Sequence, residues 1–456
     1  MVVSAMNPPG RDDATYASRV TSPPRGCSRP GFDVTPRRPP ATFRGRTMRR
    51  RIHASVVPRE LREADALMKR IADVARLLPA LTADNAADER ARLVETLDRG
   101  ETPSPRWALA RRRVEPELWR TLDMARRLTA ELPIARLYEE RLEELEIELG
   151  MIEALGDSKR IRPLAARRFG TGRTRVPLDD GDVTLGGVAR TLMDSLPHRE
   201  EERVVPASGP SGSVSLAALM LAVARSAGLD IDVKIEPRLS AGAATGDRTV
   251  FLAARCFGRA ESLRFAVHEV LGHAVAAANA RDQPIRLFEL GTAGSFSSQE
   301  GLCLCLEERA GVLDAYRLRI IAARVLVTDR MHDGAPFGET ARWLVDEHGF
   351  SASDAIGVSE RAYRGGGVAR DVGYLHGWLR VRAALEANQT SIDHMRVGRV
   401  GLDVAKQLPA LVEMGLARPP RHRPSLARSL SATEDGTSRD TSPPSVAASL
   451  TMLEET

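Results

Sequence analysis

The stretch LRFAVHEVLGHAVAAAN, residues 263–279, has the apolar pattern of a helix and carries two histidines five positions apart. Glu269 directly follows the first of them. Helices that bind one metal ion usually space two histidines four positions apart, since positions i and i+4 lie about 40° apart around the axis. Positions i and i+5 lie about 140° apart, so a regular α-helix would not direct both His268 and His273 at one ion.

A local distortion of the helix would remove this objection. One extra residue can be absorbed as a single π-helical turn, which is frequent at functional sites. Gly272, directly before the second histidine, tolerates such a distortion. We therefore predict a π-bulge if His268 and His273 bind a metal, whereas a regular α-helix would argue against a site and leave both as core or surface histidines.

A third ligand is needed, because a zinc ion in a catalytic site usually has three protein ligands and a fourth position for water. Glu300, in SSQEGL at residues 297–302, is the predicted third ligand, because it begins an otherwise apolar helix in which a charge needs a partner. Glu269 is the predicted general base, since it adjoins a ligand and can accept a proton from water that the metal activates. The prediction is one Zn²⁺ per chain.

The residues that follow Glu300 receive less specific assignments. Glu307 and Glu308 are predicted to lie on the exposed continuation of the same helix. Cys303 and Cys305 could serve as soft metal ligands, but a Cys-x-Cys pair alone favours packing in the core over metal binding.

The sequence around this stretch predicts an α+β fold that is predominantly helical. Residues 230–236 alternate polar and apolar side chains, as a half-buried strand does. SAGAATGD is typical of a turn and RTVFLAA of a returning strand, so we expect a β-hairpin over residues 230–253, directly before the metal-binding helix. The preceding helix, VSLAALMLAVARSAGL, is expected to end at Gly228.

Composition divides the chain into four predicted regions. These are a disordered basic leader (1–52), a helical N-terminal region (53–200), a catalytic region (201–416) and a disordered tail rich in Ser, Thr and Pro (417–456). The leader holds 11 Arg and three Asp and the tail is neutral, so the body carries −3 of the net charge of +5. We therefore expect no nucleic-acid partner. No apolar run is long enough to span a membrane, and the four cysteines fit a reducing cytoplasm.

Several motifs resemble one known family. HEVLGH (268–273) and QEGLC (299–303) are similar to the H-E-x-x-x-H and Q-E-G-L-A motifs of the QEGLA-motif metallopeptidases. The bacterial members of that family are named after flavohaemoglobin expression, and its animal relatives include the microtubule-associated tyrosine carboxypeptidase. Further similarities lie at residues 279–284, 363–366 and 370–375, so the resemblance spans residues 61–409.

This resemblance implies a zincin-like catalytic domain in which zinc binds to His268, His273 and Glu300. It also implies that Glu269 is the catalytic acid/base, which agrees with the assignment from ligand chemistry. The chain departs from the two motifs without losing a ligand. The glycine of the first motif lies one place later, at Gly272, and a cysteine ends the second.

A group of polar residues further along the chain is a candidate for substrate binding. Arg364, Arg370 and Tyr374 could hold the terminal carboxylate of a peptide, because arginine binds a carboxylate through two parallel hydrogen bonds. Arg370 stands where the family has lysine, which keeps the charge and changes the shape. The alternative is that Arg364 and the three glycines after it form a solvated loop while Tyr374 packs in a helix.

The leading hypothesis is a cytoplasmic zinc carboxypeptidase that removes C-terminal residues, aromatic ones among them, from a peptide or protein tail. The predicted hairpin would bind the substrate strand by β-augmentation. One alternative is a metal-dependent amidase that acts on a small molecule or a cell-wall-type peptide. Another is a regulatory protein without catalytic activity. The sequence does not indicate an oligomeric state.

Overall fold

The computed structural model describes residues 57–110, 112–178, 181–197, 204–209, 214–237, 239, 241–426 and 429. For residues 177, 178, 181 and 182 it describes the backbone alone. The predicted basic leader, residues 1–52, and the predicted tail from residue 430 onwards lie outside the described residues.

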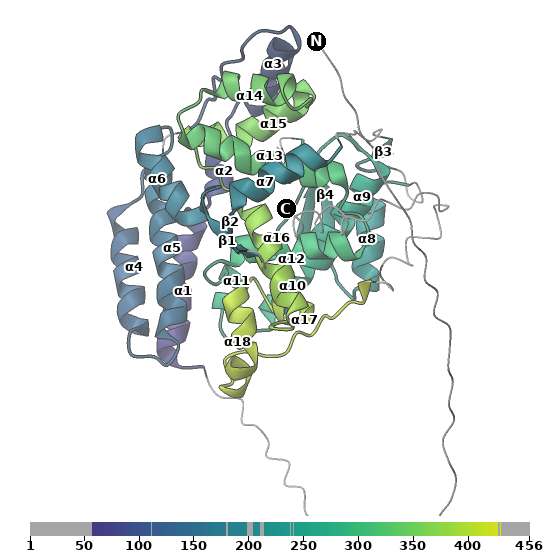
Figure 1. The fold of residues 1–456 in the computed structure, drawn as a ribbon. Coiled ribbons are helices and arrows are strands. Elements are labelled where there is room, and N and C mark those ends of the chain that lie inside the picture. Colours follow the sequence, from purple (N-terminus) through teal and green to yellow (C-terminus); the bar gives the residue numbers. More distant parts are fainter. Residues whose placement is uncertain are drawn as a thin grey trace, which may run out of the picture. The chain divides into compact units, whose positions relative to one another are not determined.

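Six helices form the first part of the described chain. They are α1 (Arg59–Val74), α2 (Leu77–Leu81), α3 (Ala86–Asp98), α4 (Pro116–Thr129), α5 (Ala135–Glu153) and α6 (Ser158–Phe169). In Figure 1, α1, α4 and α5 lie side by side, with α6 against α5. α1 packs there because its buried residues Leu61, Ala64, Met68 and Ile71 recur every three or four positions and form one apolar face.

Two short antiparallel strand pairs follow, together with two helices. The elements are β1 (Arg175–Leu178), β2 (Gly181–Thr184), α7 (Leu185–Ser195), β3 (Val205–Pro206), α8 (Leu216–Ser226) and β7 (Cys256–Phe257). β1 pairs with β2, and β3 pairs with β7. The prediction for the end of α8 is confirmed, because Gly228 follows it with a φ of 68°, the left-handed conformation that favours glycine.

A three-stranded sheet lies beside the predicted metal-binding helix. Its strands are β4 (Asp232–Ile235), β6 (Thr249–Leu252) and β5 (Ala243–Thr245), in that spatial order. β4 pairs with β6 in parallel, and β5 pairs with β6 antiparallel. The predicted hairpin between β4 and β6 is therefore wrong: the supposed turn contains β5. Alanine and glycine are depleted in strands, so propensity did not reveal β5, which is held by its pairing with β6.

The second half of the chain is helical. Its elements are α9 (Arg259–Phe265), η1 (Ala266–Ala274), α10 (Val275–Arg281), α11 (Leu287–Leu290), α12 (Ser295–Arg309), α13 (Ala315–His332), α14 (Phe337–Asp346), α15 (Ala352–Tyr363), η2 (Arg364–Gly366), α16 (Val372–Glu386), α17 (Ile392–Met395) and α18 (Leu402–Glu413). α9, η1 and α10 form one continuous helix whose middle part, η1, is a π-helix. α12 packs against both η1 and α16.

α12 and α16 approach each other with their backbones in contact. A Cβ atom added to Gly301 of α12 would collide with the carbonyl of Gly377 in α16. A Cβ atom added to Gly377 would collide with the carbonyl of Ser297. Only glycine permits this separation, and it places α12 between two helices so that most of its residues are buried.

Two hydrophobic clusters meet at η1. The larger cluster joins residues of α1 to α7 with residues of α12 to α18, and the smaller one joins α8, the three-stranded sheet and α10. η1 contributes Val267 to the larger cluster and Val270 and Leu271 to the smaller. The packing therefore does not follow the boundary predicted at residues 200/201, because the larger core contains residues from both sides of it.

The described chain is mostly helical with small sheets, which confirms the predicted α+β class. None of its described helices combines the length and the apolar character that a membrane span needs. Residues 417–426, which were assigned to the disordered tail, lie along α10. Asn279 of α10 exchanges hydrogen bonds with the backbone of His422, and Gln283 does so with that of Arg418.

Candidate metal centre

The π-helix η1 brings the two histidines together. It runs over the nine residues Ala266–Ala274, and the amide of Val275 at its end donates to the carbonyl of Val270, five positions back. Bonds between positions five apart bring His268 and His273 onto one side of the helix. Their ring centroids lie 4.9 Å apart with the ring planes at 75°. The predicted distortion is therefore confirmed.

Glu300 projects from α12 towards both rings. Its Oε2 atom lies 3.2 Å from Nε2 of His268 and 3.8 Å from Nε2 of His273. The carboxylate is buried, yet among the described residues Oε2 has no hydrogen-bond partner with acceptable geometry. Burial raises the pKa of Glu300, but the two histidines outweigh it and hold the pKa well below its usual value. The site thus contains an ionised carboxylate oxygen that faces two imidazole nitrogens.

These three atoms are of the kinds that bind a metal ion. Zn–N and Zn–O bonds of 2.0–2.1 Å place neighbouring ligand atoms about 3.3 Å apart, close to the separations between Glu300 and the two histidines. Two imidazoles and one carboxylate are a common ligand set of catalytic zinc. An unpartnered buried carboxylate oxygen costs free energy unless a proton or a cation satisfies it. The structure therefore brings the three predicted ligand side chains close together.

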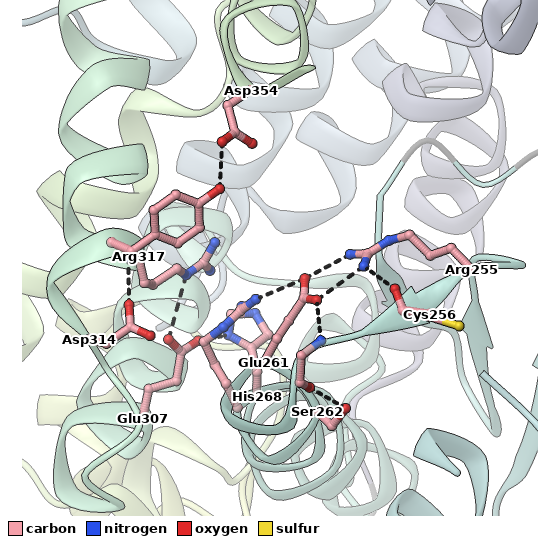
Figure 2. A network of polar contacts seen from close by, with 12 residues as sticks. Arg255, Cys256, Glu261, Ser262, His268, Glu307, Asp314, Arg317 and Asp354 are labelled. Carbon is pink, nitrogen blue, oxygen red and sulfur yellow. Dashed lines mark hydrogen bonds and ion pairs between the residues drawn. The ribbon is translucent and has the colours of Figure 1, made fainter. Parts of the chain in front are cut away.

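Glu307 contacts Nδ1 of His268, the ring nitrogen other than the one that faces Glu300. Its Oε1 lies 2.6 Å from Nδ1 of His268, and its Oε2 lies 3.6 Å from Nε of Arg317 on α13. Figure 2 shows Glu307 between these two side chains. A carboxylate at this position fixes the tautomer of a histidine that binds metal. The carboxylates Glu300 and Glu307 both raise the pKa of His268, to about 10, although burial lowers it.

The prediction that Glu307 and Glu308 lie on an exposed stretch is wrong. Glu307 is fully buried, and Glu308 is half-buried and accepts a hydrogen bond from Nε1 of Trp378. The reason is that α12 is enclosed by η1 and α16. A signal was present in the sequence: Glu307 follows Glu300 by seven positions, two helical turns, and so lies on the same face.

Glu269 lies beside the histidines and faces the sheet. Its Oε2 accepts a hydrogen bond of 2.7 Å from Oγ1 of Thr245, at the end of β5. β5 is the outer strand of the three-stranded sheet. This contact holds one carboxylate oxygen of Glu269 at the edge of the sheet.

Cys303 also reaches the centre. Its Sγ lies 3.6 Å from Nε2 of His273, and Cys303, His268 and His273 each offer a ligand atom within 4.8 Å of the others. Cys305, two residues later, belongs instead to the larger hydrophobic cluster.

The three predicted substrate-binding residues occupy different environments. Tyr374 lies on α16. Burial raises the pKa of its hydroxyl, and the charge of Glu300 raises it further. Arg364, at the start of η2, is buried, and burial lowers its pKa to about 10. Arg370 is half-buried and stacks on the ring of Phe296, with 3.8 Å between Cζ and the ring centroid. The alternative of a solvated Arg364 is therefore wrong.

Two further arginines near Tyr374 were not found from the sequence. Arg317 and Arg324 of α13 lie over its ring, with Cζ at 5.9 and 5.0 Å from the centroid. Arg324 also lies 3.5 Å from the carboxylate of Asp371, to which Arg361 donates a hydrogen bond. The spacing of seven between Arg317 and Arg324 places them on one helical face, but nothing in the sequence pairs that face with Tyr374.

The guanidinium groups around Asp371 carry more charge than their partner. Burial raises the pKa of Asp371, but Arg361 and Arg324 outweigh it and hold the pKa at about 2. Burial and the charge of Arg361 together lower the pKa of Arg324 to about 10. Within the described part of the chain, Nε of Arg324 and Nε of Arg364 have no hydrogen-bond partner. This arginine cluster, Arg324, Arg361 and Arg364 with Asp371, can accommodate an anion.

The structure defines a mostly helical α+β protein with a buried cluster of two histidines and a glutamate, next to a second carboxylate. The model of the family described as microtubule-associated tyrosine carboxypeptidase matches residues 99–439, about three quarters of the chain. The chain belongs to this family, which makes it a peptidase of the carboxypeptidase type. No curated protein and no solved structure matches it. The predicted relationship to the tubulin carboxypeptidase is confirmed at the level of the family.

Proposed function

We propose that the protein is a zinc-dependent carboxypeptidase with a zincin-like centre, related to the bacterial QEGLA-motif metallopeptidases through its H-E-x-x-x-H helix. The observation that carries the proposal is the unpartnered Oε2 of Glu300, which faces Nε2 of both His268 and His273. His268, His273 and Glu300 would hold one Zn²⁺. When bound, this ion polarises the scissile carbonyl and makes water acidic enough to attack it at neutral pH.

The protein positions the ligands before the substrate arrives. With a proton on Nδ1, His268 donates to Oε1 of Glu307 and keeps the lone pair of Nε2 free for the metal. Arg317 stabilises the charge of Glu307 in turn. The close backbone contact between α12 and α16 supports the position of Glu300 on α12.

Glu269 is the proposed proton carrier. Its Oε2 is held by Thr245, so Oε1 can accept a proton from the attacking water and deliver it to the nitrogen of the leaving amino acid. Thr245 also connects this step to the sheet. The outer strand β5 is the edge at which the substrate backbone would pair, in place of the hairpin expected from the sequence.

The arginine cluster is the proposed site for the substrate's terminal carboxylate. Among the described residues, two of its guanidinium groups have an Nε without a hydrogen-bond partner, and the charges of both the cluster and Glu300 act on the hydroxyl of Tyr374. Arginine binds a carboxylate in a bidentate way, which would restrict cleavage to the chain end. Arg364, Arg324 and Tyr374 are the proposed contacts. Arg370, stacked on Phe296, would contact the side of the substrate.

The substrate we propose is the C-terminal tail of a peptide or protein. The family is named after a tyrosine carboxypeptidase, and an aromatic terminal residue is our proposal for the substrate of this chain. A reducing cytoplasm is the proposed location, which the free thiols of Cys256, Cys303 and Cys305 support.

The proposal is tested with the full chain and its Glu269→Gln variant, both loaded with zinc and checked for metal content. Each is incubated with peptides that vary in the last residue and end in either a free carboxylate or an amide, and the products are identified by mass spectrometry. We expect wild type alone to remove single residues, and only from free carboxylate ends. Cleavage of small amides with no cleavage of peptides would instead indicate the amidase, and metal binding without any cleavage would reject both enzymes.

A further inference from the structure

Cys303 lies at the metal centre rather than merely in the core near it. It follows Glu300 by one helical turn on α12 and is fully buried. Its sulfur lies 3.6 Å from Nε2 of His273 and 3.8 Å from Nδ1 of the same ring. A metal with a Zn–S bond of 2.3 Å and a Zn–N bond of 2.0–2.1 Å holds the two ligand atoms about 3.5 Å apart. The sulfur therefore lies against the ring of His273, and Cys303, His268 and His273 each offer a ligand atom within 4.8 Å of the others.

The space for this sulfur is created by Gly272 in η1. A Cβ atom at position 272 would collide with Sγ of Cys303. The nearest hydrogen-bond acceptor for the thiol on the protein backbone is the carbonyl of His268, at 3.5 Å, which is a weak contact. Gly272 and Cys303 are also among the positions at which the chain departs from the motifs it resembles, and they face each other in the structure.

We propose that the Cys303 thiolate is a fourth protein ligand of the metal centre and closes it in the resting protein. The inference rests on the proposed metal centre and adds a ligand to it. His268, His273, Glu300 and Cys303 would together offer two nitrogens, one oxygen and one sulfur, donors that Zn²⁺ accepts. Glu300 gives separate support for a bound cation, because its buried Oε2 has no hydrogen-bond partner among the described residues.

Closing the centre would be a ligand exchange: Cys303 would bind the ion as a thiolate, its proton would pass to solvent, and the water that it replaces would be released. Opening would return the proton to the thiol and water to the vacated position. Because the thiolate takes the position that water holds in a catalytic centre, the peptidase reaction requires Cys303 to leave first.

The test uses Co²⁺ in place of Zn²⁺ in the full chain, since thiolate ligands of Co²⁺ give a charge-transfer absorption in the near ultraviolet. We expect this absorption in wild type, its loss in Cys303→Ala, and its retention in Cys305→Ala, the matched control on the same helix. X-ray absorption of the zinc-loaded protein is expected to show one sulfur neighbour at about 2.3 Å in wild type and Cys305→Ala. Loss of the ligand should also weaken zinc binding by about tenfold or more.

The outcomes separate this inference from the proposed function. If wild type binds Co²⁺ without the charge-transfer absorption and without a sulfur neighbour, Cys303 is a packing residue and the metal centre stands. If folded wild type binds neither metal, the proposed function fails and the inference fails with it. Should Cys303→Ala not fold, the sulfur neighbour in wild type and in Cys305→Ala decides the question alone.

Discussion

Two buried groups of charged residues in this protein are built on opposite principles. Between α5 and α6, Arg141 and Arg168 contact Glu144 and Glu148 at distances from 2.7 to 3.2 Å, two positive charges against two negative ones. At the metal centre, the carboxylates of Glu269, Glu300 and Glu307 gather around two histidines. Among the described ion pairs of these three carboxylates, a single arginine, Arg317, takes part.

The difference separates structural charge from functional charge. A balanced network satisfies itself, and burial is tolerated because every charge has a partner. The proposed metal centre places three carboxylates beside two histidines, and the arginine cluster places three guanidinium groups around Asp371. We propose that the ligand of the first site is a cation and that of the second a carboxylate.

The largest expected effect is on activity. Glu300→Gln removes the carboxylate ligand, so metal content should fall and peptidase activity should drop by about 10³-fold or more, because the ion supplies several kcal/mol of transition-state stabilisation. Metal analysis and turnover of a free-carboxylate peptide measure both. Full activity in a folded Glu300→Gln protein would show that this group of carboxylates is not a metal site.

The corresponding change in the ion-pair network between α5 and α6 should lower the stability of the fold instead of the activity. Glu148→Gln leaves Arg141 and Arg168 with Glu144 as their shared partner, and breaking a buried ion pair costs about 3 kcal/mol. Denaturant unfolding should therefore show a lower free energy of unfolding. Turnover per folded molecule should remain that of wild type; a loss of activity equal to that of Glu300→Gln would contradict the distinction between the two groups.

Asp65 shows what a buried carboxylate without an arginine costs. It accepts hydrogen bonds from Tyr138 and from the amide of Arg286, yet burial raises its pKa from 3.8 to about 6. The folded state therefore binds a proton that the unfolded state releases between pH 3.8 and 6, so this group's contribution to stability falls as pH rises through that window, by about 3 kcal/mol. Asp65→Asn should lack this fall, and the difference in unfolding free energy between variant and wild type, measured from pH 4 to 7, checks it.

The arginine cluster is expected to act on substrate binding. Arg324→Gln should raise KM for peptides with a free carboxylate about 10- to 100-fold, the value of a charge-assisted hydrogen bond pair. Arg370→Gln is the control, since its guanidinium stacks on Phe296 and should contribute less. Equal increases in KM for the two variants would indicate that Arg370 also binds the carboxylate, as predicted from the sequence.

The last prediction concerns Glu307, which contacts Nδ1 of His268. Glu307→Gln should weaken zinc binding about 10- to 100-fold, because it removes the carboxylate that orients His268. Glu308→Gln, next to it on α12, contacts Trp378 and should leave zinc affinity unchanged. Competition with a chromophoric chelator measures both, and equal affinities in the two variants would contradict the role of Glu307.

The sequence predicted the parts of the centre that depend on local spacing. The spacing of five between His268 and His273 required a π-bulge, which is found, and the isolated charge of Glu300 required a nearby polar group, which the two histidines provide. β5 was missed because its alanines have little strand propensity, and its strand conformation depends on pairing with β6.

The remaining residues could not be predicted because their roles arise from packing between distant segments. Arg324 acts with Asp371 only because α13 and α16 are neighbours, and Glu307 is buried only because α12 is enclosed on two sides. Helical periodicity places these residues on a face but does not say which helix covers it.

The contact between α12 and α16 also constrains how this family can vary. Because neither Gly301 nor Gly377 can gain a single carbon atom without striking the backbone of the other helix, a change at one position cannot be compensated by a smaller residue at the other. Any relative that keeps this helix separation must carry glycine at both positions, 76 residues apart. The glycine pair is therefore a search criterion for distant members, independent of the metal ligands, and it would also identify relatives that have lost catalysis but kept the fold.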